Sequence, residues 1–227
     1  MKRWRVWLLA GTATVVLSGF FLAVMRPPGG QASRFGQDLP WQITRSPDGT
    51  TISVFSLTLS QSTVRDATNK LGRRYDFGLF QDKVGQLSLE IYFRDAVVGG
   101  LNARLVLLAR LPDDALQAIR SRAGTSKPSA DGGRHYPVAK ADQDLVLSAP
   151  IAVITFMPVA KLNPDLVRTR FGEPSERIST KDGTHWLYPQ FGLDLLLGEN
   201  GEALLQYVSP PDFAERLRSP LTQENRH

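Results

Sequence analysis

Two carboxylates are the residues of this 227-residue chain best suited to acid–base chemistry. Glu90 lies within the apolar run Leu89-Glu90-Ile91, and Asp194 lies within Leu193-Asp194-Leu195. A carboxyl group inside an apolar segment is the natural candidate for a general acid. Side chains in a strand alternate between its two faces, however, so each carboxylate should lie opposite its apolar neighbours. We therefore expect both to face solvent or to pair with an arginine.

The other reactive residue types form no recognisable motif. The three histidines are His135, His185 and His227, and none shares a metal-binding spacing with a second histidine. We expect His135 and His185 to be ordinary surface residues, with His185 in a turn. The chain has no cysteine, which excludes a thiolate nucleophile, a disulfide and a zinc–sulfur site. Phosphate-binding glycine motifs and the G-x-S-x-G elbow are also absent. The sequence thus predicts no catalytic residue, no metal ligand and no cofactor.

Three aromatic residues are the candidates for binding another protein. Trp186 and Tyr188 alternate on one face of a predicted strand, and Phe191 follows shortly after it. One interpretation is that these rings form the core of the C-terminal half. The other is that they make an exposed platform, since Trp and Tyr are common anchors at protein interfaces.

The N-terminal segment indicates where the protein works. Residues Val6 to Met25 carry no charge, and Lys2, Arg3 and Arg5 precede them. Twenty residues in a helix rise about 30 Å, which matches the hydrocarbon core of a bilayer. We expect a single-pass inner-membrane anchor with its basic N-terminus in the cytoplasm and the domain in the periplasm. The alternatives are a cleaved signal peptide, although no Ala-x-Ala site ends the run, and a buried helix of a soluble protein.

The charge balance argues against nucleic acid as a partner. The chain has 27 Lys and Arg against 22 Asp and Glu. Four of the cations flank the anchor, namely Lys2, Arg3, Arg5 and Arg26, which leaves 23 against 22 for the rest. The basicity of the whole chain therefore reflects membrane topology in part and does not indicate a basic binding surface.

An internal duplication, offset by about 100 residues, organises the rest of the chain. Ile52–Leu57 and Ile151–Phe156 both read as strands, and a short helix follows each. Thr63 and Asn163 are suitable N-caps for these helices, and Gly72 and Gly172 suit their C-terminal ends. Antiparallel strands follow in both halves. The predicted segments are a basic end at 1–5, an anchor at 6–25, a breaker-rich linker at 26–40, module one at 41–124, a connecting region at 125–148, module two at 149–218 and a tail at 219–227.

The predicted fold is α+β, with two tandem helix-plus-antiparallel-sheet modules behind a transmembrane helix. The segment from Asn163 to Pro174 and the strands Trp186–Tyr188 and Leu204–Val208 resemble the small module of the outer-membrane assembly lipoprotein family (SmpA/BamE type). The β-lactamase inhibitory protein fold carries two similar modules in tandem. The first half departs from the pattern, because it lacks the proline after Gly72 and the Trp-x-Tyr strand.

The resemblance implies a binding protein without catalytic activity. We expect a membrane-anchored envelope protein that contacts another protein through sheet faces or loops. One alternative is an inhibitor-like module that blocks an exported enzyme. Another is an envelope hydrolase with Glu90 or Asp194 as its acid.

Overall fold

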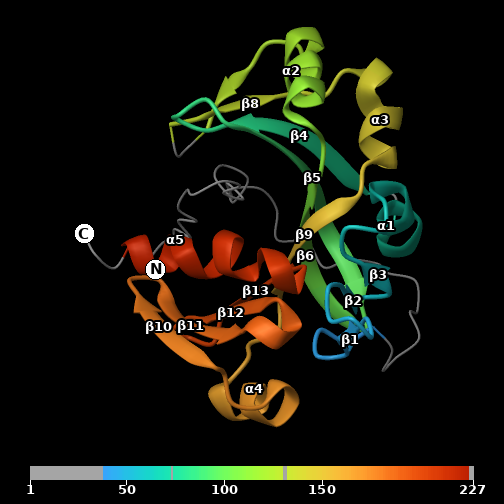
Figure 1. The fold of residues 1–227 in the computed structure, drawn as a ribbon. Coiled ribbons are helices and arrows are strands. Elements are labelled where there is room, and N and C mark those ends of the chain that lie inside the picture. The colour runs from blue at the N-terminus through green and yellow to red at the C-terminus, as the bar shows by residue number, and fades with distance from the viewer. Residues whose placement is uncertain (1–37, 73, 130–131, 225–227) are drawn as a thin grey trace.

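The computed structural model describes residues 38–72, 74–129 and 132–224, which form an α+β fold with one large antiparallel sheet and five α-helices (Figure 1). The α-helices are α1 Val64–Leu71, α2 Asp113–Arg122, α3 Gln143–Ser148, α4 Pro164–Phe171 and α5 Ser219–Glu224. The 3₁₀ segments are η1 Lys140–Asp142, η2 Pro189–Phe191 and η3 Pro210–Asp212, and η4 Ala214–Arg218 is a π-helix.

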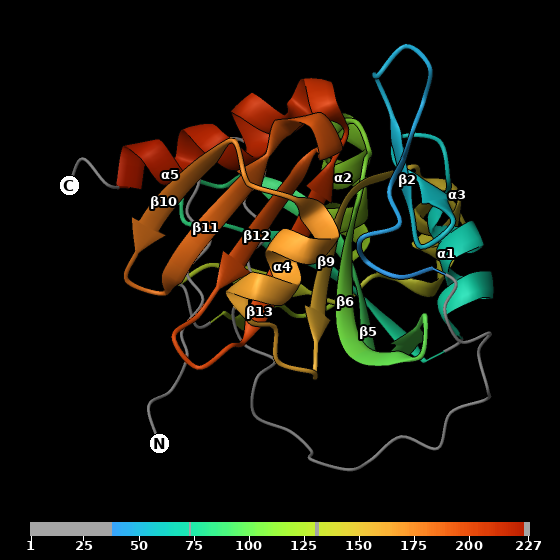
Figure 2. The same cartoon turned by 90° about the horizontal axis from the view of Figure 1, so that it is seen from below.

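Ten strands form the large sheet, in the order β10-β11-β12-β13-β9-β6-β5-β4-β8-β7. Their bounds are β4 Tyr75–Gln81, β5 Leu87–Val98, β6 Leu101–Ala109, β7 Lys127–Pro128, β8 Arg134–Tyr136, β9 Ile151–Pro158, β10 Glu176–Thr180, β11 Gly183–Tyr188, β12 Leu193–Leu197 and β13 Ala203–Val208. The two halves of the chain meet where β6 pairs with β9, from Ala103 opposite Pro158 to Ala109 opposite Ile151. One continuous sheet therefore spans both predicted modules (Figure 2).

The two faces of this sheet bury different side chains. We call one the core face, which includes Ile91, Leu107 and Ile154 and carries the larger apolar cluster. Helices α1 to α4 pack on it, together with a small three-stranded sheet made of β1 Thr44–Arg45, β2 Ile52–Val54 and β3 Leu57–Thr58. We call the other the second face. Its smaller cluster joins strand residues to Phe213, Leu217 and Leu221 of the C-terminal segment.

The predicted helix caps are confirmed. The Asp66 backbone N–H donates to Thr63 Oγ1 at 3.2 Å, and the Thr63 N–H donates to the Asp66 carboxylate at 2.8 Å, which makes a reciprocal capping box. At the start of α4, the Leu166 N–H donates to Asn163 Oδ1 at 2.7 Å. Gly72 and Gly172 end the two helices with φ of 108° and 81°, values that favour glycine.

The first predicted strand, Ile52–Leu57, is confirmed only over Ile52–Val54, because β2 and β3 form a tight hairpin there. Phe55 and Ser56 have φ of 55° and 54° and make the two-residue turn between the strands. This left-handed conformation is unfavourable for both residues. The Phe55 ring is fully buried, with its centroid 5.0 Å from that of Phe156, and this burial compensates for the backbone cost. Consequently this segment is not the counterpart of Ile151–Phe156, which lies in the middle of the large sheet.

Other differences concern segments that carry little sequence signal. Strands β4 and β10 were not predicted, and the connecting region 125–148 contains β7, β8 and α3. Helix α5 also continues through the predicted tail as far as Glu224. The anchor segment 6–25 lies outside the described residues. Among the helices described, none is both long and apolar enough to cross a membrane.

Candidate functional site

The second face carries both carboxylates that the sequence singles out, and both are buried. Glu90 on β5 is 0% exposed and Asp194 on β12 is 1% exposed. The expectation that they face solvent is therefore wrong. Alternation did place them opposite their apolar neighbours, but the second face is buried at these positions as well.

Asp194 is paired with a buried histidine. His185 Nδ1 lies 2.8 and 3.0 Å from the two carboxylate oxygens of Asp194. His185 lies inside β11 and is 4% exposed, so the expectation of a surface histidine in a turn is wrong. The pair is diagonal across neighbouring strands, because His185 is opposite Leu196 and Asp194 is opposite Leu187.

A carboxylate beside Nδ1 fixes the orientation of the imidazole, as in catalytic Asp–His pairs. Burial of both side chains closes this pair to a substrate in the conformation described. No group of three or more His, Cys, Asp or Glu in the described ranges could hold a metal ion.

Two further polar side chains extend this pair across the sheet. Asp194 is opposite Gln206 on β13, and Gln206 is opposite Thr155 on β9. Gln206 is 4% exposed and Thr155 is 0% exposed. Facing residues on adjacent strands have Cβ atoms about 5 Å apart, so the three side chains are direct neighbours. We call His185, Asp194, Gln206 and Thr155 the polar row.

The Thr155 hydroxyl has an unusual environment. Among the described residues, its Oγ1 is the buried side-chain atom that has no hydrogen-bond partner. A buried hydroxyl without a partner destabilises the fold, because it loses its bonds to water and gains none in return. Groups of this kind are rare and call for a physical explanation.

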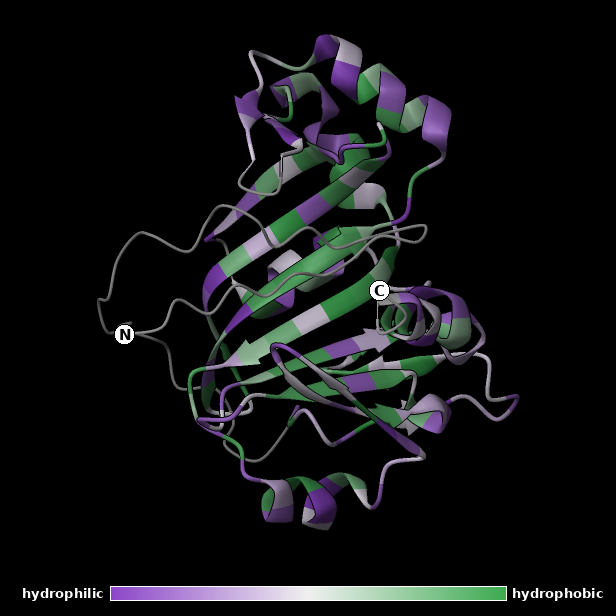
Figure 3. Cartoon of the chain, turned by 90° about the vertical axis from the view of Figure 1, so that its left-hand side faces the viewer, coloured by the Kyte–Doolittle hydropathy of each residue, from purple (hydrophilic) through white to green (hydrophobic). Residues whose placement is uncertain are grey.

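Apolar residues border the polar row and hold the C-terminal segment over this part of the sheet. Ile178 is opposite His185, Leu187 is opposite Asp194, and Val106 is opposite Thr155. All three belong to the cluster that contains Phe213, Leu217 and Leu221. Figures 1 and 2 show η4 and α5 lying across the strands from β9 to β10. Coloured by hydropathy, the strands are mostly green with purple interruptions (Figure 3).

No known family model, curated protein or solved structure matches this chain. Function is therefore inferred from the residues and their geometry.

Glu90 belongs to a second polar group on the same face. Its carboxylate accepts a hydrogen bond from the Tyr92 hydroxyl, and Ser88 Oγ lies 3.4 Å from its other oxygen. The Tyr92 ring packs edge-on against Phe80, whose ring stacks on His135 with centroids 4.7 Å apart. Burial, and then the charge of Lys127, lower the pKa of His135, which favours its neutral form.

The three candidate protein-binding residues lie on the core side. Trp186 and Tyr188 are buried and Phe191 is partly buried against the main core, which supports the core interpretation of these rings. The Tyr188 hydroxyl donates to the carbonyl of Gly172 at 3.0 Å, and burial raises its pKa to about 12. A role of the three residues in binding a partner stays a prediction.

Arginines shield the Trp186 ring from solvent. The guanidinium carbons of Arg168 and Arg177 lie 5.3 and 4.5 Å from the ring centroid. Both arginines also pair with Glu173, and Arg168 pairs with Asp165 as well. Cation–π contacts of this kind stabilise the ring where it is.

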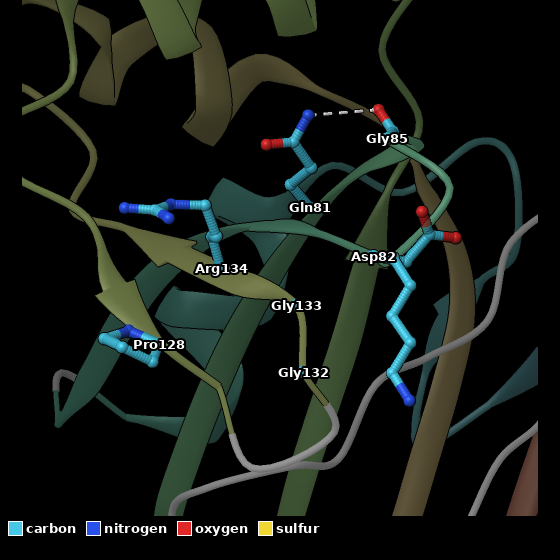
Figure 4. Close-up of a pocket in the computed structure, with 8 residues that line it drawn as sticks. Gln81, Asp82, Gly85, Pro128, Gly132, Gly133 and Arg134 are labelled. Carbon is cyan, nitrogen blue, oxygen red and sulfur yellow. Dashed lines mark hydrogen bonds between the residues drawn. The ribbon is translucent and has the colours of Figure 1, made fainter.

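A cavity of about 430 Å³ lies at the other end of the sheet, between the β4–β5 turn and the β7–β8 hairpin (Figure 4). Its polar groups mainly maintain these turns. Asp82 Oδ1 accepts from the N–H groups of Val84 and Gln86, and Gln81 Nε2 donates to the Gly85 carbonyl. Arg134 donates to Ser126 Oγ at 2.9 Å. Because its polar groups are exposed and serve the local backbone, we regard the cavity as a weaker candidate than the polar row.

The sequence contained a signal for the residues that were missed. Thr155 and Gln206 interrupt apolar runs, Val153-Ile154-Thr155-Phe156 and Leu204-Leu205-Gln206-Tyr207, just as Asp194 does. The signal shows that these side chains share a face opposite apolar residues. It does not show that this face is covered, or that β13 lies beside β9, where Gln206 pairs with Thr155.

Proposed function

We propose that the chain is a single-pass membrane-anchored binding protein of the cell envelope, with two related modules behind the anchor. The observation that carries this proposal is the uncharged run from Val6 to Met25 behind Lys2, Arg3 and Arg5. A run of this length matches the bilayer core, and its basic flank favours a cytoplasmic N-terminus. The remaining chain is nearly neutral and would then lie in the periplasm.

A role in binding is better supported than catalysis. The side chains best suited to acid–base work, Glu90, Asp194 and His185, are all buried. A hydrolase needs such groups within hydrogen-bond reach of its substrate. A broad sheet with a separate cover on one face is better suited to contact another protein.

Membrane fractionation of the full chain tests the anchor. We expect the protein to stay with membranes in alkaline carbonate and to be digested by protease only when the outer side of the inner membrane is accessible. Replacing Val15 and Val16 by arginine should release the protein from membranes, because central charges oppose insertion. Replacing the same residues by leucine is the matched control and should change nothing. An intact mass that lacks residues 1–25 would refute the anchor and support a cleaved signal peptide.

Crosslinking in intact cells tests the binding function. A photo-crosslinking residue at the exposed Val84 or Val159 should yield a specific protein adduct if these loops lie near the partner. Hydrolysis of envelope material that is lost in Asp194→Asn, in a variant shown to be folded, would contradict the proposal of a non-enzymatic protein.

A further inference from the structure

The C-terminal segment contacts the second face through one side only. Phe213, Leu217 and Leu221 follow one another at intervals of four residues and are all buried. Residues i, i+4 and i+8 share one face of a helix. The segment therefore docks as an amphipathic helix, with three apolar side chains on the strand residues that border the polar row.

Ion pairs at the edges orient this segment. Asp212, just before the first apolar anchor, pairs with Arg110 at 2.8 Å. Arg218, five residues after that anchor, pairs with Glu176 on β10 at 2.7 Å. The side chains of these four residues are 30–50% exposed, and exposed pairs of this kind fix geometry more than they add stability.

The helix itself is irregular at its centre. Residues Ala214–Arg218 form a π-helix, and both the backbone N–H and the hydroxyl of Ser219 donate to the Ala214 carbonyl. Pro220 explains the irregularity, because its ring has no N–H to donate and crowds the carbonyl four residues earlier. Short π segments are rare and recur at functional sites.

The polar row makes this face suited to exposure. A surface that is always covered by an apolar helix face is most stable when it is itself apolar. Here the cover lies beside His185, Asp194 and Gln206, and beside the Thr155 hydroxyl that has no partner in the described part of the chain. Burial of this hydroxyl costs free energy, which is regained when water or a polar partner reaches it. The segment forms no strand pair, so its displacement would leave the sheet intact.

We propose that the second face is a helix-binding surface, that residues 210–224 occupy it as an internal ligand, and that a partner helix displaces them. This inference rests on the proposed binding function and identifies its surface. The present occupant defines the chemistry of the partner. The partner is an amphipathic helix with bulky apolar residues at positions i, i+4 and i+8. An acidic residue at position i−1 would pair with Arg110, and a basic residue at position i+5 would pair with Glu176. Helix-in-groove recognition works through such regularly spaced anchors.

A peptide experiment tests the proposal with the full chain in detergent. The probe is a fluorescent synthetic peptide with the sequence of residues 209–224. The variant Phe213→Ala/Leu217→Ala weakens the docking of the internal helix on the second face. We therefore expect the peptide to bind this variant at least about tenfold more tightly than it binds the wild type. The control Leu116→Ala weakens the docking of α2 on the core face and should leave peptide binding unchanged.

A locked variant tests the same surface in the opposite direction. Since the chain has no cysteine, Glu176→Cys/Arg218→Cys can be joined by a short thiol–thiol crosslinker. The crosslinked form should not bind the peptide, whereas the same variant without the crosslinker should bind it. Equal binding to the locked, wild-type and weakened proteins would overturn the proposal, as would no binding to any of them.

Hydrogen exchange on the unmodified chain is an independent check that needs no variant. The amides of residues 214–224 should exchange at least about 100-fold faster than those of β12 and β13, because the segment opens without unfolding the sheet. Equal protection of helix and strands would overturn the proposal. These outcomes are separate from the anchor: a protein that is not membrane-bound but still binds the peptide would refute the proposed localisation and leave this inference intact.

Discussion

Replacing Thr155 by valine should make the protein more stable. Valine has nearly the same shape and the same preference for strands, so the change removes the hydroxyl and little else. Thr155 is fully buried on the central strand β9, and its Oγ1 has no hydrogen-bond partner in the described part of the chain. Thr155→Val therefore relieves a cost in the folded state without breaking a bond.

The size of the effect follows from this geometry. A buried polar group without a partner costs about 1–3 kcal/mol, and most of this should be regained. For a domain of this size, each kcal/mol corresponds to a rise in Tm of roughly 2–4 °C. The matched control is Val153→Thr, which places a hydroxyl two residues earlier on the same strand and face, at a position that is 3% exposed. It should destabilise the fold by a similar amount.

Urea denaturation followed by circular dichroism measures both variants. We expect a higher midpoint for Thr155→Val and a lower one for Val153→Thr, with unchanged m values. A loss of more than about 1 kcal/mol in Thr155→Val would refute the reasoning, because it would mean that the hydroxyl makes a stabilising bond.

Three further experiments test the local structure. Asn163→Ala should lower the free energy of unfolding by about 1 kcal/mol in urea denaturation, because it removes the cap of α4. Gly192→Ala should cost at least about 2 kcal/mol more than Gly49→Ala by the same assay. Both glycines have positive φ, but a Cβ at Gly192 would lie 2.0 Å from the Val208 carbonyl oxygen, whereas at Gly49 it would meet only the flexible end of Arg45. Finally, hydrogen bonds from Thr63 lower the pKa of Asp66 in the folded protein. The Asp66 carboxylate therefore stabilises the fold when the pH is above its unfolded pKa near 4. This stabilisation is lost as the pH falls through the lower pKa of the folded state. Thr63→Ala should raise the pKa of Asp66 in an NMR titration, and an unchanged value would contradict this.

Local signals in the sequence predicted much of the fold. The caps at Thr63 and Asn163 and the glycines at 72 and 172 fix helix ends through contacts within four residues, so they can be recognised without the tertiary structure. The strands in which apolar residues alternate, such as β5 and β6, were found for the same reason. The hairpin at Phe55 and Ser56 was not predicted, because it depends on packing of the Phe55 ring against Phe156, about a hundred residues away.

The candidate site was predicted only in part. Alternation placed Glu90 and Asp194 on the correct face, but it could not show that the face is covered. That depends on where residues 210–224 fold back, and no local pattern fixes their position. The pairing of His185 with Asp194 depends on the register between β11 and β12, which is set by the short turn at Gly192.

The pairing of β6 with β9 has a consequence for how the chain tolerates breakage. These strands form the seam between the halves, and they are held together by backbone hydrogen bonds and by apolar residues on both of their faces. One cut in the segment 124–129, whose residues are exposed or half-buried, separates the halves in sequence. After such a cut the two fragments should remain associated, because the pairing of β6 with β9 is unaffected. Either half made alone would instead present a long, apolar, unpaired strand, so the two fragments should be insoluble singly and should reassemble when they are produced together.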